Sequence, residues 1–357
     1  MQKPNITPNS VISLMAPTAA GKTALAYELY DTGRYELISV DSALIYRDMN
    51  IGTAKPTAQE LQDYPHHIVD IIDPTQSYSV ADFVQDVERL VTDIHNRDKI
   101  PLLVGGTMMY YMALFDGLSR IPDSDLAIRA KVEKWRQADG IEALYQYLHS
   151  VDKSTAKRLH SSDTQRITRA VEVYQQTGKP ISEWQALPKQ ALAHNPQQNW
   201  IGLGVIPDRQ WLHTRIKMRL ETMWASGFVP EVLGLINKYH LTQTMPSMRC
   251  VDYRQVIDYL LTTDKIYVKN GFLQIKEGVS ETFNPFAQKN QRKESVGVDE
   301  ACQDMKNKAL YATRQLAKRQ TTWLRKLNKL ACSDVENDKS LSILSINSIE
   351  KAKQLLI

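Results

Sequence analysis

Short apolar runs separated by helical patterns dominate the first part of the chain. Four apolar segments of strand length are bounded by polar or glycine-containing turns, and we predict them to be buried strands: Val11–Met15, Leu37–Val40, Pro101–Val104 and Trp200–Val205. Between the second and the third, apolar residues recur at helical spacing within Ser79–Arg97. Strands that alternate with helices indicate an α/β fold with a parallel sheet.

The pattern changes to helices alone between about Gly117 and Asn195. Ser162 or Asp163 has the residue type of a helix N-cap, and Gly178 followed by Pro180 is a strong helix stop. We therefore expect residues 118–195 to form an all-helical domain inserted into an α/β core made of residues 1–117 and 196–330.

Two segments fit neither pattern. Residues 262–299 have mixed polarity, and Gln288–Glu294 is rich in Gln, Lys and Arg. We expect a solvent-exposed insertion there that is partly disordered at its charged part. Residues 331–357 are expected to form a short C-terminal tail.

Composition narrows the class of protein. The chain has 357 residues, of which 43% are hydrophobic and 24% charged, as in ordinary globular proteins. Its three cysteines, Cys250, Cys302 and Cys332, are odd in number and far apart, which fits neither a disulfide framework nor a zinc site. No apolar stretch approaches the ~20 residues of a membrane span, and the N-terminus lacks the plan of a signal peptide. These features predict a cytoplasmic protein without a membrane partner.

Residues 16–23, with the sequence APTAAGKT, nearly match the phosphate loop G-x-x-x-x-G-K-[ST]. In such a loop, successive backbone N–H groups and a helix N-terminus surround an oligophosphate. Lys22 would neutralise the phosphates, and the Thr23 hydroxyl can ligate Mg²⁺. Ala16 stands where the motif has its first glycine, and a positive φ there would cost about 1 kcal/mol.

Polar residues follow two other predicted strands. Asp41 comes after the second strand and Gly105-Gly106-Thr107 after the third, and in a parallel sheet this edge faces the ligand crevice. Asp41 can accept a proton from a nucleophile, or it can merely fix the turn that follows. Arg215 and Arg219 are four residues apart on a predicted helix, so they either reach one anion together or lie on the surface.

The net charge of +4 is small, but cations gather near the end of the chain. Residues 305–330 hold eight basic side chains and no acidic one. Arg314, Lys318, Arg325 and Lys329 fall within about 60° of one another on a helical wheel, opposite an apolar face that includes Trp323. A face of aligned cations favours a nucleic-acid backbone as partner.

These pieces together resemble one family closely, the bacterial tRNA dimethylallyltransferases, also called tRNA isopentenyltransferases. The matching segments run in family order from about residue 11 to 327. They are PTAAGKT (17–23), ISVDSALIY (38–46), DMNIGTAKP (48–56), PLLVGGTM (101–108), DTQRITR (163–169), MRCVDYRQ (248–255) and ATRQLAKRQTTWLR (312–325).

The resemblance implies transfer of a dimethylallyl group from dimethylallyl diphosphate to N6 of the adenine next to the anticodon. The accepted tRNAs would read codons that begin with U, diphosphate would be released, and the cofactor would be Mg²⁺, held through Thr23. Asp41 would be the general base, with Thr107, Lys22 and Arg219 also catalytic. We expect the enzyme to bind the tRNA anticodon stem-loop as a monomer, without consuming ATP.

The same resemblance assigns binding residues. Those implied to hold the diphosphate or a nucleotide are Ala16, Pro17, Thr18, Ala19, Ala20, Gly21, Lys22, Thr23 and Arg215. Those implied to contact tRNA are Asp41, Ser42, Ala43, Leu44, Thr107, Arg129, Gln165, Arg166, Ile167, Thr168, Arg169, Arg249, Cys250, Val251, Asp252, Tyr253, Arg254, Lys318, Arg319, Gln320, Thr321, Thr322, Trp323, Leu324 and Arg325.

The chain departs from the family at Asp252, where relatives usually have glycine, and the stretch from about Thr262 to Asp299 is longer than usual. Both Asp and Gly are acceptable helix N-caps, so we expect the local geometry to survive. Two other functions share some of these features. One is a small-molecule kinase, and the other is a non-catalytic RNA-binding module with a relic phosphate loop.

Overall fold

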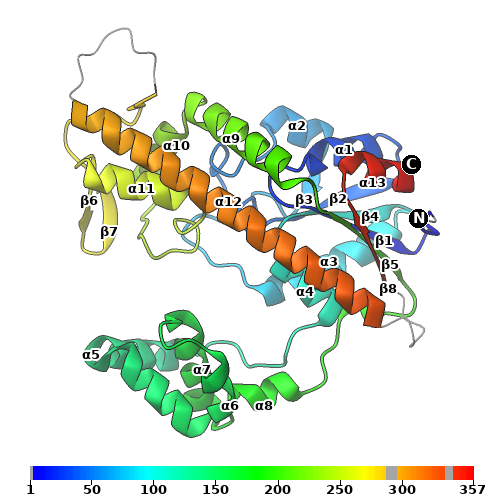
Figure 1. Ribbon diagram of the computed structural model, residues 1–357, viewed down its shortest axis with the longest axis horizontal. Coiled ribbons are helices and arrows are strands. Elements are labelled where there is room, and N and C mark those ends of the chain that lie inside the picture. The colour runs from blue at the N-terminus through cyan, green and yellow to red at the C-terminus, as the bar shows by residue number, and fades with distance from the viewer. Residues whose placement is uncertain (1–2, 287–295, 334–340) are drawn as a thin grey trace. The chain divides into compact units, whose positions relative to one another are not determined.

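The computed structural model describes residues 3–286, 296–333 and 341–357 (Figure 1). The chain divides into two compact units, of which unit 1 comprises residues 1–115 and 192–357 and unit 2 comprises residues 116–191. The predicted limits of the inserted domain, 118 and 195, lie two and four residues after the observed ones. Across the described residues, no helix combines the length and the apolar character needed to cross a membrane.

Unit 1 is built on a six-stranded sheet in the order β3-β2-β4-β1-β5-β8. Every neighbouring pair of strands is parallel, which confirms the predicted fold class. The strands are β1 (Ser10–Met15), β2 (Tyr35–Val40), β3 (His66–His67), β4 (Ile100–Gly105), β5 (Asn199–Val205) and β8 (Leu341–Ile346). The four predicted strands are the four central ones, which are continuous apolar runs because both faces of the sheet are covered.

Helices pack on both faces of this sheet (Figure 1). In Figure 1, α1 and α13 lie beside each other on one side, while α3, α4 and the long helix α12 lie on the other. The helices of unit 1 are α1 (Lys22–Tyr30), α2 (Ala58–Asp63), α3 (Val80–His95), α4 (Met108–Asp116), α9 (Arg209–Ala225), α10 (Phe228–Lys238), α11 (Tyr253–Thr262), α12 (Val296–Ser333) and α13 (Ile349–Leu356), with a short 3₁₀ helix at Leu192–His194.

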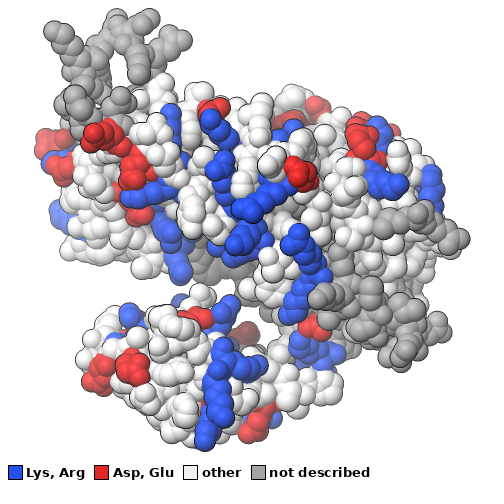
Figure 2. All heavy atoms as spheres, viewed as in Figure 1, with Lys and Arg blue, Asp and Glu red and all other residues white. Residues whose placement is uncertain are grey.

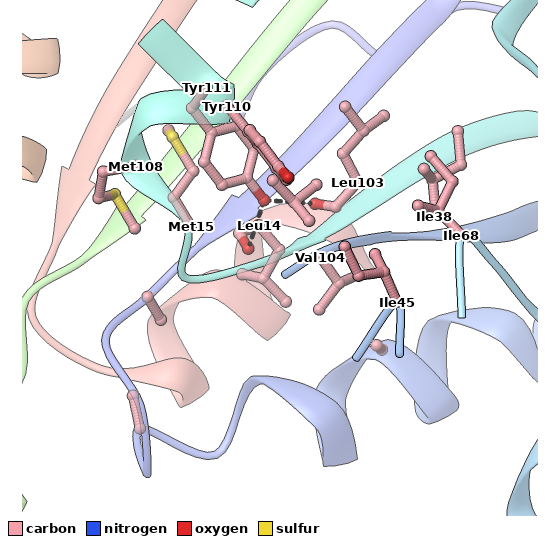
Figure 3. Close-up of a cluster of buried hydrophobic side chains, with 14 of the residues drawn as sticks. Leu14, Met15, Ile38, Ile45, Ile68, Leu103, Val104, Met108, Tyr110 and Tyr111 are labelled. Atoms are coloured by element: carbon pink, nitrogen blue, oxygen red, sulfur yellow. Dashed lines mark hydrogen bonds between the residues drawn. The ribbon is translucent and has the colours of Figure 1, made fainter. Parts of the chain in front are cut away.

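The core beneath α4 shows how the sheet edge is held in place (Figure 3). Tyr111 is fully buried, and its hydroxyl group lies 3.4 Å from the carbonyl oxygen of Leu14 and 3.2 Å from that of Leu103. Phe83 of α3 stacks on Tyr110 of α4 with ring centroids 4.0 Å apart. These contacts attach α4 to β1 and β4, the two strands that carry the phosphate loop and Thr107.

The C-terminal segment corrects one prediction. Residues 341–357 are not an appendage, because β8 pairs with β5 in parallel from Trp200–Leu341 to Val205–Ile346. Helix α13 then packs against α1, and Lys353 forms an ion pair with Glu28 at 2.8 Å. In β8, serines interrupt the apolar positions, so the segment lacks the continuous apolar run that identified the central strands.

The second segment without a clear pattern contains a hairpin. Strands β6 (Ile266–Lys269) and β7 (Phe272–Ile275) pair in an antiparallel manner, and Ile266 and Leu273 are buried in the core of unit 1. Tyr267, Val268 and Phe272 of the same hairpin are exposed, so the predicted exposure holds for most of this part and is wrong only for the two buried residues. The charged run Gln288–Glu294 lies outside the described residues.

Unit 2 is helical, as its sequence pattern predicts. It contains α5 (Leu126–Val151), α6 (Lys153–Arg158), α7 (Thr164–Thr177) and α8 (Ile181–Ala186) around an apolar core of its own. Asp163 caps α7 by accepting a hydrogen bond from the backbone of Arg166, and Gly178 ends it in the left-handed conformation. The two ends of the unit meet, since Leu118 forms a β-bridge with Gln190 and Lys189 lies 2.6 Å from Asp116.

Candidate active site

The phosphate loop connects β1 to α1. Helix α1 starts at Lys22 after Gly21, whose φ is 89°, and its first turn has no acidic residue. The helix N-terminus therefore presents backbone N–H groups that favour an anion. Ala16 is buried and is not among the residues with positive φ, whereas Ala19 has φ 63°. The missing first glycine thus introduces no backbone strain at residue 16.

Two side chains from distant elements support the loop. The Nε of Arg215 on α9 donates to the carbonyl oxygen of Ala19 at 2.8 Å. Gln320 on α12 accepts a hydrogen bond from the backbone N–H of Thr18 at 3.0 Å and donates to the carbonyl oxygen of Gly106 at 2.8 Å. Gln320 therefore links the loop after β1 to the loop after β4.

Asp41 and Thr107 follow the ends of two neighbouring strands at the same edge of the sheet. Val40 and Gly105, which end β2 and β4, are partners in the ladder. The carboxylate of Asp41 accepts a hydrogen bond from the backbone N–H of Ala43 at 2.8 Å, and the Thr107 hydroxyl accepts one from that of Ser42 at 3.0 Å. Asp41 therefore does fix the turn, and this bond also fixes the orientation of its carboxylate.

A cavity of about 570 Å³ joins these elements. Lys22, Thr23, Asp41, Thr107 and Arg219 all line it, so the structure brings the predicted catalytic residues together. Its volume is within the usual range for sites that bind small organic molecules. The apolar part of its wall includes side chains from α4 and α12, namely Met108, Met109, Leu316 and Trp323.

Two cations of the cavity, Lys22 and Arg219, are partly withdrawn from water. Burial lowers the pKa of Lys22 to about 8, and the charge of Arg219 lowers it further against the opposing effect of Asp41. Burial also lowers the pKa of Arg219, against the carboxylates of Asp252 and Asp41. An anion bound between the two cations would stabilise the charge of both, because it would replace the water they have lost.

Asp252 brings a second carboxyl group into this cavity. Its backbone has φ 76°, its residue is only 6% exposed, and its carboxylate accepts a hydrogen bond from the Thr313 hydroxyl at 3.0 Å. Burial raises the pKa of Asp252 to about 7, although Thr313 and Arg219 favour the charged form. Burial, with the charges of Asp41 and Asp252, likewise raises the pKa of the Cys250 thiol to about 12, so this thiol stays protonated.

A second hollow adjoins the cavity between α11 and α12, and we call it the basic groove. It is lined by Arg254, Lys308 and Tyr311, and it shares Arg249 and Arg319 with the cavity. Figure 2 shows Lys and Arg side chains gathered over the region where α9 and α12 lie in Figure 1. The buried residues of α12 include Thr313 and Gln320, so the buried face is rotated from the predicted apolar face.

Comparison with known proteins gives the family. A family model described as IPP transferase matches residues 44–327, which is most of the chain. A tRNA dimethylallyltransferase of Psychrobacter sp. (strain PRwf-1) is 60% identical over 355 residues, covering 98% of this chain and 95% of that protein. The chain belongs to the IPP transferase family.

Solved structures agree with this assignment. The full-length tRNA isopentenylpyrophosphate transferase of Bacillus halodurans has a TM-score of 0.56 and 28% identity, covering 97% of this chain and 93% of that one. A eukaryotic dimethylallyltransferase acting on tRNA has a TM-score of 0.65 at 23% identity, covering 96% and 75% of the two chains, and shows a shared fold.

The residues predicted to contact tRNA differ in their exposure. Several have side chains at the surface, namely Ser42, Arg129, Gln165, Arg166, Arg249, Arg254, Lys318, Arg319, Thr322 and Arg325. Five others are buried, namely Ile167, Asp252, Tyr253, Gln320 and Leu324, and their side chains pack inside the fold or make internal hydrogen bonds. The remaining ones are partly exposed. Arg169 is tied to Ser124 and to the carbonyl oxygen of Pro122 within unit 2.

The role of Gln320 as a link between the two loops was not predicted. A glutamine in a basic helix carries no local signal for a contact with a loop three hundred residues earlier. Arg249, Arg254 and Arg319 of the basic groove were predicted to contact tRNA, whereas Lys308 was not. Arg314 belongs to the predicted cationic face of α12 but is not among the described residues that line the groove. Arg314 instead interacts electrostatically with His213 of α9.

Proposed function

We propose that the enzyme transfers a dimethylallyl group from dimethylallyl diphosphate to N6 of the adenine next to the anticodon of tRNA, releasing diphosphate. One observation carries this proposal: a phosphate-binding loop with desolvated cations and a carboxylate at a strand end line one cavity. The family assignment supports the same reaction.

The residues of the cavity have distinct tasks in this reaction. The bond between N6 and the first carbon of the dimethylallyl group forms, the bond from that carbon to the diphosphate oxygen breaks, and the N6 proton goes to Asp41. An exocyclic adenine amine is a weak nucleophile, so removal of its proton lowers the barrier. Lys22, Arg219 and the N–H groups of the loop stabilise the charge of the departing diphosphate.

The adenine has to leave its stack to reach Asp41, which costs a few kcal/mol. Apolar side chains at the cavity wall, among them Trp323 and Met109, offer surfaces against which an extruded base can stack. The phosphates next to it would follow the basic groove, where Arg249, Arg254 and Arg319 supply positive charge.

The residues at the loop fit a magnesium ion. Mg²⁺ binds oxygen atoms and is usually held by one or two protein groups together with substrate phosphates. Thr23 offers an exposed hydroxyl at the start of α1, and Asp41 lines the same cavity. We propose that Thr23 holds the ion beside the diphosphate, where the ion supplies further neutralisation of the leaving group.

Incubation of the protein with labelled dimethylallyl diphosphate, Mg²⁺ and unmodified tRNA tests the proposal. We expect label on an adenosine of the anticodon loop, identified by nuclease digestion and mass spectrometry. Asp41→Asn should lower turnover by ~10²–10⁴ while tRNA affinity is kept. Turnover equal to that of the unaltered enzyme would remove Asp41 from the mechanism.

The comparisons do not support the two alternative functions, and the same assay separates them. A small-molecule kinase would leave the tRNA unlabelled and would consume ATP in the presence of a metabolite. A non-catalytic RNA-binding module would bind tRNA without turnover, and Lys22→Ala would change nothing. Either pattern would overturn the proposed transferase.

A further inference from the structure

The carboxylate of Glu231, outside the cavity, accepts an unusually large number of hydrogen bonds. Glu231, in the first turn of α10, accepts hydrogen bonds from three successive backbone N–H groups: Asn50 at 3.0 Å, Ile51 at 2.6 Å and Gly52 at 3.0 Å. The Tyr253 hydroxyl of α11 donates to the same carboxylate at 2.5 Å. Hydrogen bonds to an ionised acceptor are roughly twice as strong as neutral ones, so Glu231 holds this loop firmly.

The loop at residues 50–53, which Glu231 binds, is also tightly packed. A Cβ atom on Gly52 would lie 2.1 Å from a ring carbon of Phe228 and 2.5 Å from one of Tyr253. Phe228 and Tyr253 contact each other edge to face with centroids 4.9 Å apart. The backbone at Gly52 therefore sits directly against two aromatic rings and has little freedom to move toward α10 and α11.

The loop ends at a residue that touches Arg219. The carbonyl oxygen of Thr53 accepts a hydrogen bond from the Arg219 guanidinium at 3.0 Å. Gly52, Thr53 and Arg219 line the cavity, whereas Glu231 is not among the described residues that do. A continuous set of contacts thus runs from Glu231 through the backbone of residues 50–53 to a cation of the cavity.

We propose that Glu231 is a positioning residue that fixes Arg219 for the leaving diphosphate. The proposal rests on the proposed function, which gives Arg219 its ligand. The guanidinium has several N–H donors, and its bond to Thr53 leaves the others for phosphate oxygens. If the loop moved, the bond to Thr53 would be lost, and Arg219 would have to be reordered each time a diphosphate bound.

A double-mutant cycle in which the affinity for pyrophosphate is measured tests the proposal. Glu231→Gln replaces two acceptor oxygens by one oxygen and an NH₂ group that faces backbone N–H groups. We expect about a tenfold weaker pyrophosphate affinity by calorimetry and a similar rise in the KM for the donor, with tRNA affinity kept. In the Arg219→Ala background, Glu231→Gln should have almost no further effect on pyrophosphate affinity.

A second variant guards against loss of folding. Tyr253→Phe removes one hydroxyl group from the network without changing a charge, and we expect a smaller effect in the same direction. Asp82→Asn is the matched control, because Asp82 also accepts a backbone N–H in the first turn of a helix, that of Ser79 at 2.8 Å on α3. It should leave pyrophosphate affinity unchanged.

The outcomes are distinct. An equal effect of Glu231→Gln with and without Arg219 would overturn the proposal, because the carboxylate would then act on the fold in general. An absence of any effect would overturn it as well. Failure of the proposed transferase function would appear separately, as pyrophosphate binding that follows the expected cycle in a protein that transfers no label to tRNA.

Discussion

Replacing Asp252 with asparagine should change how the folding stability of the protein depends on pH. Asp252 is buried, and its pKa is raised from the ordinary value of 3.8 to about 7, chiefly by burial. Between these two pKa values the folded protein holds a proton that the unfolded chain releases. The free energy of unfolding therefore falls as pH rises through this window, and the full penalty is present above about pH 7.

The size of the effect follows from the shift. About three pKa units at roughly 1.4 kcal/mol each correspond to roughly 4 kcal/mol over the whole window. Asparagine has nearly the same shape and can still accept the hydrogen bond of Thr313, but it does not titrate. Asp252→Gly should raise the free energy of unfolding by about 1 kcal/mol more at every pH, because glycine adopts a φ of 76° without steric strain.

Urea unfolding of both proteins at pH 5, 6, 7 and 8 measures this dependence. Relative to the unaltered protein, Asp252→Asn should gain roughly 3 kcal/mol of stability between pH 5 and pH 8. Asp258→Asn on the exposed side of the same helix is the control, and its profile should run parallel to that of the unaltered protein. Parallel profiles for Asp252→Asn as well would refute the reasoning, since the carboxyl group would then titrate equally in the folded and unfolded states.

Three further predictions concern the cavity, the basic groove and the edge of the sheet. The KM for dimethylallyl diphosphate should rise above about pH 8, where Lys22 loses its proton. Lys22→Arg should flatten this rise because arginine stays charged. A rise of equal steepness in both proteins would mean that a titrating group other than Lys22 causes it. Arg254→Ala together with Arg319→Ala should weaken tRNA binding and lower the slope of log affinity against log salt by about 1 to 2, measured by filter binding, whereas an unchanged slope would take the groove out of the RNA path. Removal of residues 341–357 should lower the free energy of unfolding, measured in urea, by ~5 kcal/mol or more, because four buried apolar side chains are lost and β5 becomes an edge strand. A near-normal unfolding midpoint would show that β8 contributes little.

The sequence was most informative where a signal was local. Continuous apolar runs predicted β1, β2, β4 and β5, and the same runs fixed which end of each strand carries Lys22, Asp41 and Thr107. Cap residues predicted the limits of α7 within one residue. Each of these signals depends on the chemistry of a few neighbouring residues, which the sequence displays directly.

What could not be predicted depends on contacts between remote segments. Gln320 belongs to α12 but bonds to the phosphate loop, and Glu231 belongs to α10 but holds the loop at Gly52. The two-residue strand β3 has no sequence pattern of its own, because its place is set by pairing with β2. Asp252 was noticed as a departure, but only its backbone angle and burial show why its carboxyl group is costly.

The contacts that join the two ends of unit 2 have a consequence for the order in which the protein folds. Central strands β1 and β5 must pair although most of the first half of the chain separates them, and such distant pairings are slow because a long loop must be closed. Contacts between Leu118 and Gln190, and between Asp116 and Lys189, bring the ends of unit 2 together. Once this unit has formed, the connection from β4 to β5 behaves as a short tether, so early folding of unit 2 would speed the docking of β5 beside β1.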